Sequence, residues 1–113
     1  MIPTGVQVFL ALEPIDLRWS FDRLSGAAQE RIGYDARCGA LFVFYGRRKD
    51  ALKILFFDGS GMVIFYKRFD SGVVRIPSDL PPGTTRVEVD DATLEALLDG
   101  IEVEPASKQR RVH

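Results

Sequence analysis

The fold is decided by the stretch ILFFDGSGMVIFYKRF, which runs from Ile54 to Phe69. It consists of two apolar segments joined by Asp-Gly-Ser-Gly, and Asp-Gly is among the strongest hairpin signals in a sequence. Because neighbouring residues of a strand point to opposite faces, Phe56 and Phe57 cannot lie in one core. The stretch therefore predicts a β-hairpin with two apolar faces, each in need of a cover, and with two adjacent cations at its end.

The length of the turn fixes which side chains share a face of this hairpin. A loop of two or four residues places Leu52, Ile54, Phe56, Val63, Phe65 and Phe69 on one face, with Lys67 near its end. The other face then holds Lys53, Leu55, Phe57, Met62, Ile64, Tyr66 and Arg68, and a loop of three residues would reverse the assignment. A helix, a second subunit or stacked nucleic-acid bases are three possible covers for this second face. Its candidate partner-binding residues are Phe57, Met62, Ile64 and Tyr66.

Further strands and two helices are expected along the rest of the chain. The strands are expected at 6–12, 40–45, 51–57, 62–69, 72–77 and 86–89. The helices are expected at about 20–32 and 91–99, with Ser20 and Asp90 as N-caps and with Gly33 and Gly100 at their ends. This pattern predicts an α+β fold: a mostly antiparallel five- to six-stranded sheet with a central meander (40–69) and two packed helices.

The length and composition are those of one globular domain. The 113 residues are 46% hydrophobic and 27% charged, close to the averages for soluble domains. We expect a single domain over residues 1–104 and a disordered basic tail over 105–113. No apolar run approaches the roughly 20 residues that span a bilayer, the N-terminal stretch does not have the pattern of a secretion signal, and the one cysteine, Cys38, is compatible with the cytoplasm.

The sequence offers little for catalysis or metal binding. The only histidine is the last residue, His113, and there is one cysteine, so an internal zinc site is not expected. Asp16, Asp22, Asp58 and Asp70 are the carboxylates to consider for two-metal chemistry. Asp22 is typical of a first helical turn, Asp58 of a hairpin turn and Asp70 of a strand end. We therefore expect a protein that is not an enzyme, with no metal, no cofactor and no small-molecule substrate.

Basic residues are the one positive signal. Residues 40–70 hold six cations and three anions, whereas residues 71–105 hold two cations and eight anions. In an antiparallel meander, the loop with Arg47 and Arg48 lies at the same edge as the strand end with Lys67 and Arg68, and Lys53 is close by. These residues form a candidate nucleic-acid-binding rim, and the alternative is a solvated rim that protects strand edges.

Two segments resemble the small accessory protein of the IS66 class of bacterial insertion sequences, the second reading frame of the element, often called TnpB. They are IDLRWSFDRL and LFVFYGRRKDALKILFFDGSGMVIFYKRFDSG. The positions that match the motifs outside the basic rim include Asp16, Arg18, Phe21, Asp22, Asp58, Gly59 and Gly61. Trp19 and Ser20 stand where Lys-Gly is usual in that family.

The resemblance implies a role in transposition beside a separate, much larger transposase that holds the strand-transfer chemistry. A second accessory protein of the same element is a further implied partner. It implies accessory status rather than a known activity. From the basic residues we hypothesise a non-catalytic factor that contacts DNA or the transposase–DNA complex, with candidate contacts at Arg18, Arg47, Arg48, Lys53, Lys67 and Arg68. The alternative is an adaptor that binds transposase subunits without touching DNA.

Overall fold

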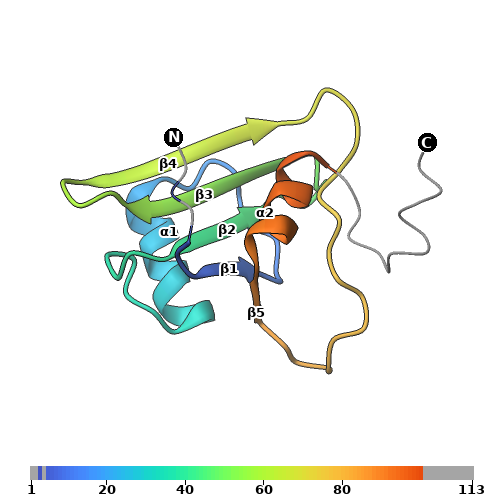
Figure 1. The fold of residues 1–113 in the computed structure, drawn as a ribbon. Helices are drawn as coiled ribbons and strands as arrows, with labels where there is room; N and C mark the ends of the chain where they lie inside the picture. The colour runs from blue at the N-terminus through green and yellow to red at the C-terminus, as the bar shows by residue number, and fades with distance from the viewer. Residues whose placement is uncertain (1–2, 4, 101–113) are drawn as a thin grey trace.

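A single mixed β-sheet with helices on both faces forms the protein (Figure 1). The computed structural model describes residues 3 and 5–100. The strands are β1 (Val8–Ala11), β2 (Leu41–Tyr45), β3 (Ala51–Phe57), β4 (Met62–Arg68) and β5 (Arg86–Val89), in the spatial order β4-β3-β2-β1-β5. The helices are α1 (Phe21–Ala27), its π-helical continuation η1 (Ala28–Ile32) and α2 (Asp91–Leu98). The predicted α+β class with a mostly antiparallel sheet is confirmed.

The β3–β4 hairpin has the register that a four-residue loop requires. Phe57 pairs with Met62, and Leu55 pairs with Ile64. The Asp58 carboxylate accepts hydrogen bonds from the main-chain N–H groups of Ser60 and Gly61 at 2.9 and 3.0 Å. Gly59 has φ of 101°, a conformation that residues with a side chain rarely adopt. The predicted assignment of side chains to the two faces is therefore confirmed, and Asp58 and Gly59 have structural roles in the turn.

Both faces of the sheet are covered by the chain itself. On one face, Leu52, Ile54 and Phe56 pack in one core with residues of α2. On the other face, Phe42, Phe44 and Leu55 pack with residues of α1 and η1. A helix is thus the cover of the second face. Met62 and Ile64 are half-buried and pack against this second core, so only part of each side chain is open to a partner.

The β1–β2 pair is the one parallel pair among the four neighbouring strand pairs, with Val8 opposite Leu41. It is parallel because α1 and η1 form a crossover between the two strands. The meander β2-β3-β4 is present as expected, and it ends with β4 at an edge of the sheet.

The two helices begin and end close to the predicted residues. Ser20 is the N-cap of α1, but its side chain makes no capping hydrogen bond, so that part of the prediction is wrong. Gly33 ends η1 with φ of 90°, as predicted. Asp90 caps α2 by accepting the N–H of Thr93 at 2.8 Å. In the described part of the chain, neither helix has the length and apolar composition to cross a membrane.

The strand predicted at 72–77 is absent, which corrects the sequence prediction. After β4 the chain turns at Gly72, which has φ of 88°, and Val74 then enters the core on the α2 face. The Val74 N–H donates to the carbonyl oxygen of Lys49 at 2.6 Å. A single bond of this kind attaches the segment to the sheet but does not make it a strand. The apolar pattern of residues 72–77 is explained instead by the burial of Val74. The tail predicted at 105–113 lies outside the described residues.

Candidate functional site

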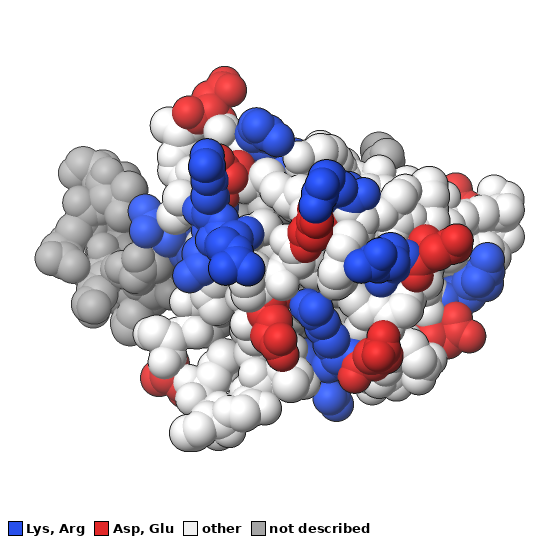
Figure 2. Space-filling view, turned by 180° about the vertical axis from the view of Figure 1, so that it is seen from behind, with Lys and Arg blue, Asp and Glu red and all other residues white. Residues whose placement is uncertain are grey.

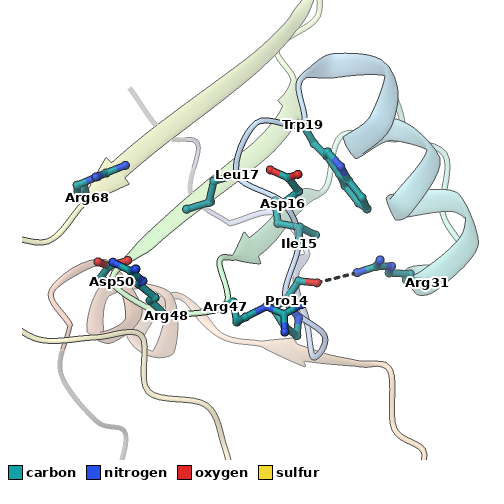
Figure 3. Close-up of a pocket in the computed structure, with 10 residues that line it drawn as sticks. All are labelled: Pro14, Ile15, Asp16, Leu17, Trp19, Arg31, Arg47, Arg48, Asp50 and Arg68. Atoms are coloured by element: carbon teal, nitrogen blue, oxygen red, sulfur yellow. Dashed lines mark hydrogen bonds between the residues drawn. The ribbon is translucent and has the colours of Figure 1, made fainter.

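An open cleft of about 570 Å³ lies between the segment that precedes α1 and the β2–β3 loop. Figure 3 shows its lining, in which arginine side chains from separate elements surround the segment 14–19. The lining residues are Pro14, Ile15, Asp16, Leu17, Trp19, Arg31, Arg47, Arg48, Asp50 and Arg68. We refer to this site as the arginine cleft.

The wall formed by residues 14–19 continues the parallel pairing of β1 with β2. The Ile15 N–H donates to the carbonyl oxygen of Tyr45 at 2.8 Å, and Ile15 forms a parallel bridge with Gly46. A Cβ atom on Gly46 would lie 2.6 Å from Cδ1 of Leu17. Glycine therefore precedes Arg47 because the Leu17 side chain occupies the space that any side chain there would need.

The β2–β3 loop presents Arg47 and Arg48 to solvent. The loop closes through a hydrogen bond of 2.9 Å from the Lys49 N–H to the Gly46 carbonyl, and Lys49 has φ of 62°. Among the described residues, the guanidinium groups of Arg47 and Arg48 make no hydrogen bond within 3.5 Å and no ion pair. Both groups are therefore available to an external anion.

Arg68 and Arg31 reach the same cleft from β4 and η1. Arg68 Nη2 donates to the Tyr66 hydroxyl at 3.1 Å, and this bond raises the pKa of Arg68. Arg31 Nη1 donates to the Pro14 carbonyl at 3.4 Å, and its guanidinium carbon lies 5.4 Å from the ring centre of Trp19. Three separate parts of the chain thus place arginines around one cavity.

Two carboxylates also line the cleft, and one of them is neutralised by an ion pair. Arg18 donates to Asp16 through Nε at 3.0 Å and Nη2 at 2.7 Å, and its main-chain N–H donates to Asp16 at 2.9 Å. The hydrogen bonds from Arg18 lower the pKa of Asp16 to about 2. The other carboxylate belongs to the half-buried Asp50, so the four arginines leave the lining with an excess of positive charge.

Only part of the predicted basic rim is brought together. Arg47, Arg48 and Arg68 line the cleft, whereas Lys53 is 7% exposed and its Nζ donates to the Trp19 carbonyl at 2.7 Å. The Lys67 Nζ donates to the Leu98 carbonyl at 2.6 Å, at the C-terminal end of α2, where a cation is favourable. Arg18, which is 90% exposed, forms the ion pair with Asp16.

The sequence analysis missed Arg31 and Trp19 as residues of the site. Arg31 follows the buried Ala27 by four residues, so the two lie on the same side of the helix. This spacing could have indicated that Arg31 is directed towards the sheet and not towards solvent. Two guanidinium groups, those of Arg23 and Arg31, lie over the ring of Trp19. Of the predicted partner-binding set, Phe57 is half-buried and Tyr66 is 47% exposed.

The surface around the cleft carries both signs of charge. Figure 2 shows the face opposite to the view of Figure 1, with blue cationic side chains spread across it and red carboxylates between them. Within the described residues, no group of three or more His, Cys, Asp or Glu side chains is placed to hold a metal ion. The arrangement favours binding of an anion at the arginine cleft.

Comparison with known proteins identifies the family. The model of the IS66 Orf2-like protein family matches residues 6–108. The chain is 36% identical over 104 residues to the uncharacterized protein y4hO of Sinorhizobium fredii strain NGR234, covering 90% of this chain and 88% of that protein. It is 33% identical over 73 residues to the uncharacterized protein y4jC of the same strain, covering 65% and 62%. No solved structure matches the chain. The chain belongs to the IS66 Orf2-like family and is a transposition-associated accessory protein of an insertion sequence.

Proposed function

We propose that this protein contacts DNA, or the transposase–DNA complex, through the arginine cleft during transposition. The observation that carries the proposal is the convergence of Arg31, Arg47, Arg48 and Arg68 on one cavity. A guanidinium group presents its N–H donors in a planar fork that matches the oxygens of a phosphate. Contacts of this kind hold a protein on DNA without reading its sequence.

The proposed role is non-catalytic. The strand-transfer chemistry belongs to a separate transposase, and this protein acts on the same DNA with that transposase and with the second accessory protein of the element. The site of action is the cytoplasm, where the bacterial chromosome lies. The ion pair of Asp16 with Arg18 supports a binding role for the cleft, because a carboxylate held in this way is a weak base.

Binding through arginine–phosphate contacts predicts a steep dependence on salt. Each neutralised phosphate adds about 0.9 to the slope of log affinity against log salt concentration. If all four arginines of the cleft are engaged, the affinity falls by about two orders of magnitude between 50 and 200 mM salt. A surface that only protects strand edges would not produce this slope.

The test is a fluorescence-anisotropy titration with DNA from the end of the element, at several salt concentrations. The double variant R47A/R48A removes two exposed cations of the cleft. Because two phosphate contacts are lost, we expect the slope of log affinity against log salt concentration to fall by roughly 1.8. The matched control is R75A/R86A, because both residues are exposed, neither lines the cleft and the loss of charge is the same.

Three results would contradict DNA contact at the cleft. They are the absence of salt-sensitive binding by the wild-type protein, an unchanged slope in R47A/R48A, and an equal loss in the control. The adaptor alternative makes a separate prediction for copurification with the transposase. A complex that survives nuclease treatment and is unaffected by R47A/R48A would show binding to the transposase without DNA.

A further inference from the structure

The edge strand β4 leaves one side of its main chain without a strand partner. β4 is the outermost strand and pairs only with β3. The Phe69 N–H donates to the carbonyl oxygen of Asp50, which sets the alternation of the antiparallel ladder along β4. Val63, Phe65 and Lys67 therefore direct their main-chain groups to β3. The residues whose main-chain groups point outward, away from the sheet, are Met62, Ile64, Tyr66 and Arg68.

β4 lacks the features that normally protect an edge strand. Protected edges are short, contain proline or a bulge, or carry charges along their length. β4 has seven residues without proline, and its pairing with β3 is continuous from Met62 to Arg68, without a bulge. The charges of the strand stand together at one end, at Lys67 and Arg68. In Figure 1, β4 forms the upper border of the sheet.

The two ends of this edge carry opposite charges. The turn before β4 holds Asp58, whose pKa is lowered by hydrogen bonds from the main chain of Ser60 and Gly61, so its carboxylate is ionised at neutral pH. The other end carries Arg68, which is exposed. In an antiparallel pair of two identical strands, the turn end of one copy lies beside the cationic end of the other. The edge is therefore electrostatically complementary to itself.

We infer that β4 pairs in antiparallel fashion with β4 of a second copy of this chain, forming a two-fold symmetric dimer with a continuous sheet. The outward main-chain groups of Ile64 and Tyr66 lie in the middle of this pairing. The two-fold axis is perpendicular to the sheet, because that operation places identical strands side by side and antiparallel. Both copies of α1 then lie on the same face, and the two arginine clefts open to the same side of the dimer.

The experiment is sedimentation velocity of the full-length chain over a range of concentrations, together with amide hydrogen exchange. We expect a monomer–dimer equilibrium, with the amides of Ile64, Tyr66 and Arg68 exchanging more slowly in the dimer. Tyr66→Pro removes an outward N–H that β3 does not use, and it should abolish the dimer. Tyr66→Ala removes the same side chain, keeps the N–H, and should leave the dimer in place.

A second pair of variants decides the matter if circular dichroism shows that Tyr66→Pro is unfolded. Arg68→Glu removes the charge complementarity twice per dimer and should raise the dimer dissociation constant by about three- to tenfold. Arg86→Glu makes the same charge change on β5, at the opposite edge of the sheet, and should leave it unchanged. A monomer at every concentration would overturn the inference, as would a dimer that a folded Tyr66→Pro or Arg68→Glu leaves intact. Two further results would also overturn the inference. Slow exchange of the outward amides in the monomer would show that another segment of this chain pairs with β4. Slow exchange only after the transposase is added would show that the transposase pairs with β4.

Discussion

The ammonium group of Lys53 donates a hydrogen bond of 2.7 Å to the main-chain carbonyl oxygen of Trp19. This bond joins the middle of β3 to the segment that enters α1, and the ammonium also lies 4.9 Å from the ring centre of Tyr66. Lys53 is thus a buried residue whose ammonium group is hydrogen-bonded inside the protein, to a residue that lines the arginine cleft.

Replacing Lys53 with methionine should destabilise the fold while leaving the salt dependence of DNA binding unchanged. Met fills a similar volume, but the Trp19 carbonyl loses its donor, which costs about 1–3 kcal/mol. Urea denaturation measures the free energy of unfolding, and Lys49→Met is the control because Lys49 is exposed and carries the same charge. A reduced salt slope in Lys53→Met would instead show that Lys53 contacts phosphate.

Replacing Gly46 with alanine should destabilise the protein through a steric conflict with Leu17. The added Cβ would lie 2.6 Å from Cδ1 and 2.9 Å from Cγ of Leu17, so the Leu17 side chain must move, at a cost of about 1–3 kcal/mol. Thermal unfolding of the single variants and of Gly46→Ala with Leu17→Ala forms a double-mutant cycle. The two substitutions should be less destabilising together than the sum of their separate effects; additive effects would show that the conflict is absent.

The stability of the protein should depend on the ionisation of Asp16 at low pH. The ion pair with Arg18 lowers its pKa from 3.8 to about 2. A carboxyl group whose pKa is lower in the folded state stabilises the fold at pH values above its pKa in the unfolded state. This contribution is lost as the pH falls from 3.8 towards 2. The difference in the free energy of unfolding between wild type and Asp16→Asn should therefore shrink in this window.

Asp58 and Asp90 also have lowered pKa values, and both remain in Asp16→Asn, so the difference between the two proteins reports on Asp16 alone. An NMR titration of the Asp16 carboxyl group should give a midpoint near 2. A midpoint near 3.8 would show that the ion pair is not maintained in solution.

Replacing Lys49 with glycine should stabilise the protein. Lys49 has φ of 62°, a left-handed conformation that costs a residue with a side chain about 1–2 kcal/mol. Glycine adopts it without that cost, although its larger entropy in the unfolded chain offsets part of the gain. The melting temperature should rank Lys49→Gly above Lys49→Ala, and the reverse order would contradict the strain.

The sequence predicted the β-sheet well where a local rule sets the geometry. The Asp-Gly turn predicts the hairpin, and a loop of two or four residues predicts the division of side chains between its faces. The structure has the register of a four-residue loop from Ala51 to Arg68. The Asp90 cap was also predictable, because the interaction with Thr93 is local. The two apolar faces of the hairpin predicted that both faces of the sheet are covered. They did not predict whether a helix, a second subunit or nucleic-acid bases cover the second face.

The errors concern contacts between residues that are distant in the sequence. Alternation correctly placed Lys53 and Lys67 on opposite faces, but nothing local indicates that each donates to a carbonyl more than thirty residues away. The apolar pattern at 72–77 indicates burial, which Val74 shows, but such a pattern does not distinguish a buried residue of a loop from a paired strand. The arginine cleft was only partly predicted, since it also requires Arg31 from η1.

Trp19 is the only tryptophan of the chain, and it lines the arginine cleft with two guanidinium groups over its ring. The indole emission of the unlabelled wild-type protein therefore comes from a single position next to the proposed ligand. An anion that draws Arg31 away from the ring changes the surroundings of that fluorophore. The protein thus contains its own optical sensor, with which occupancy of the cleft can be followed in real time.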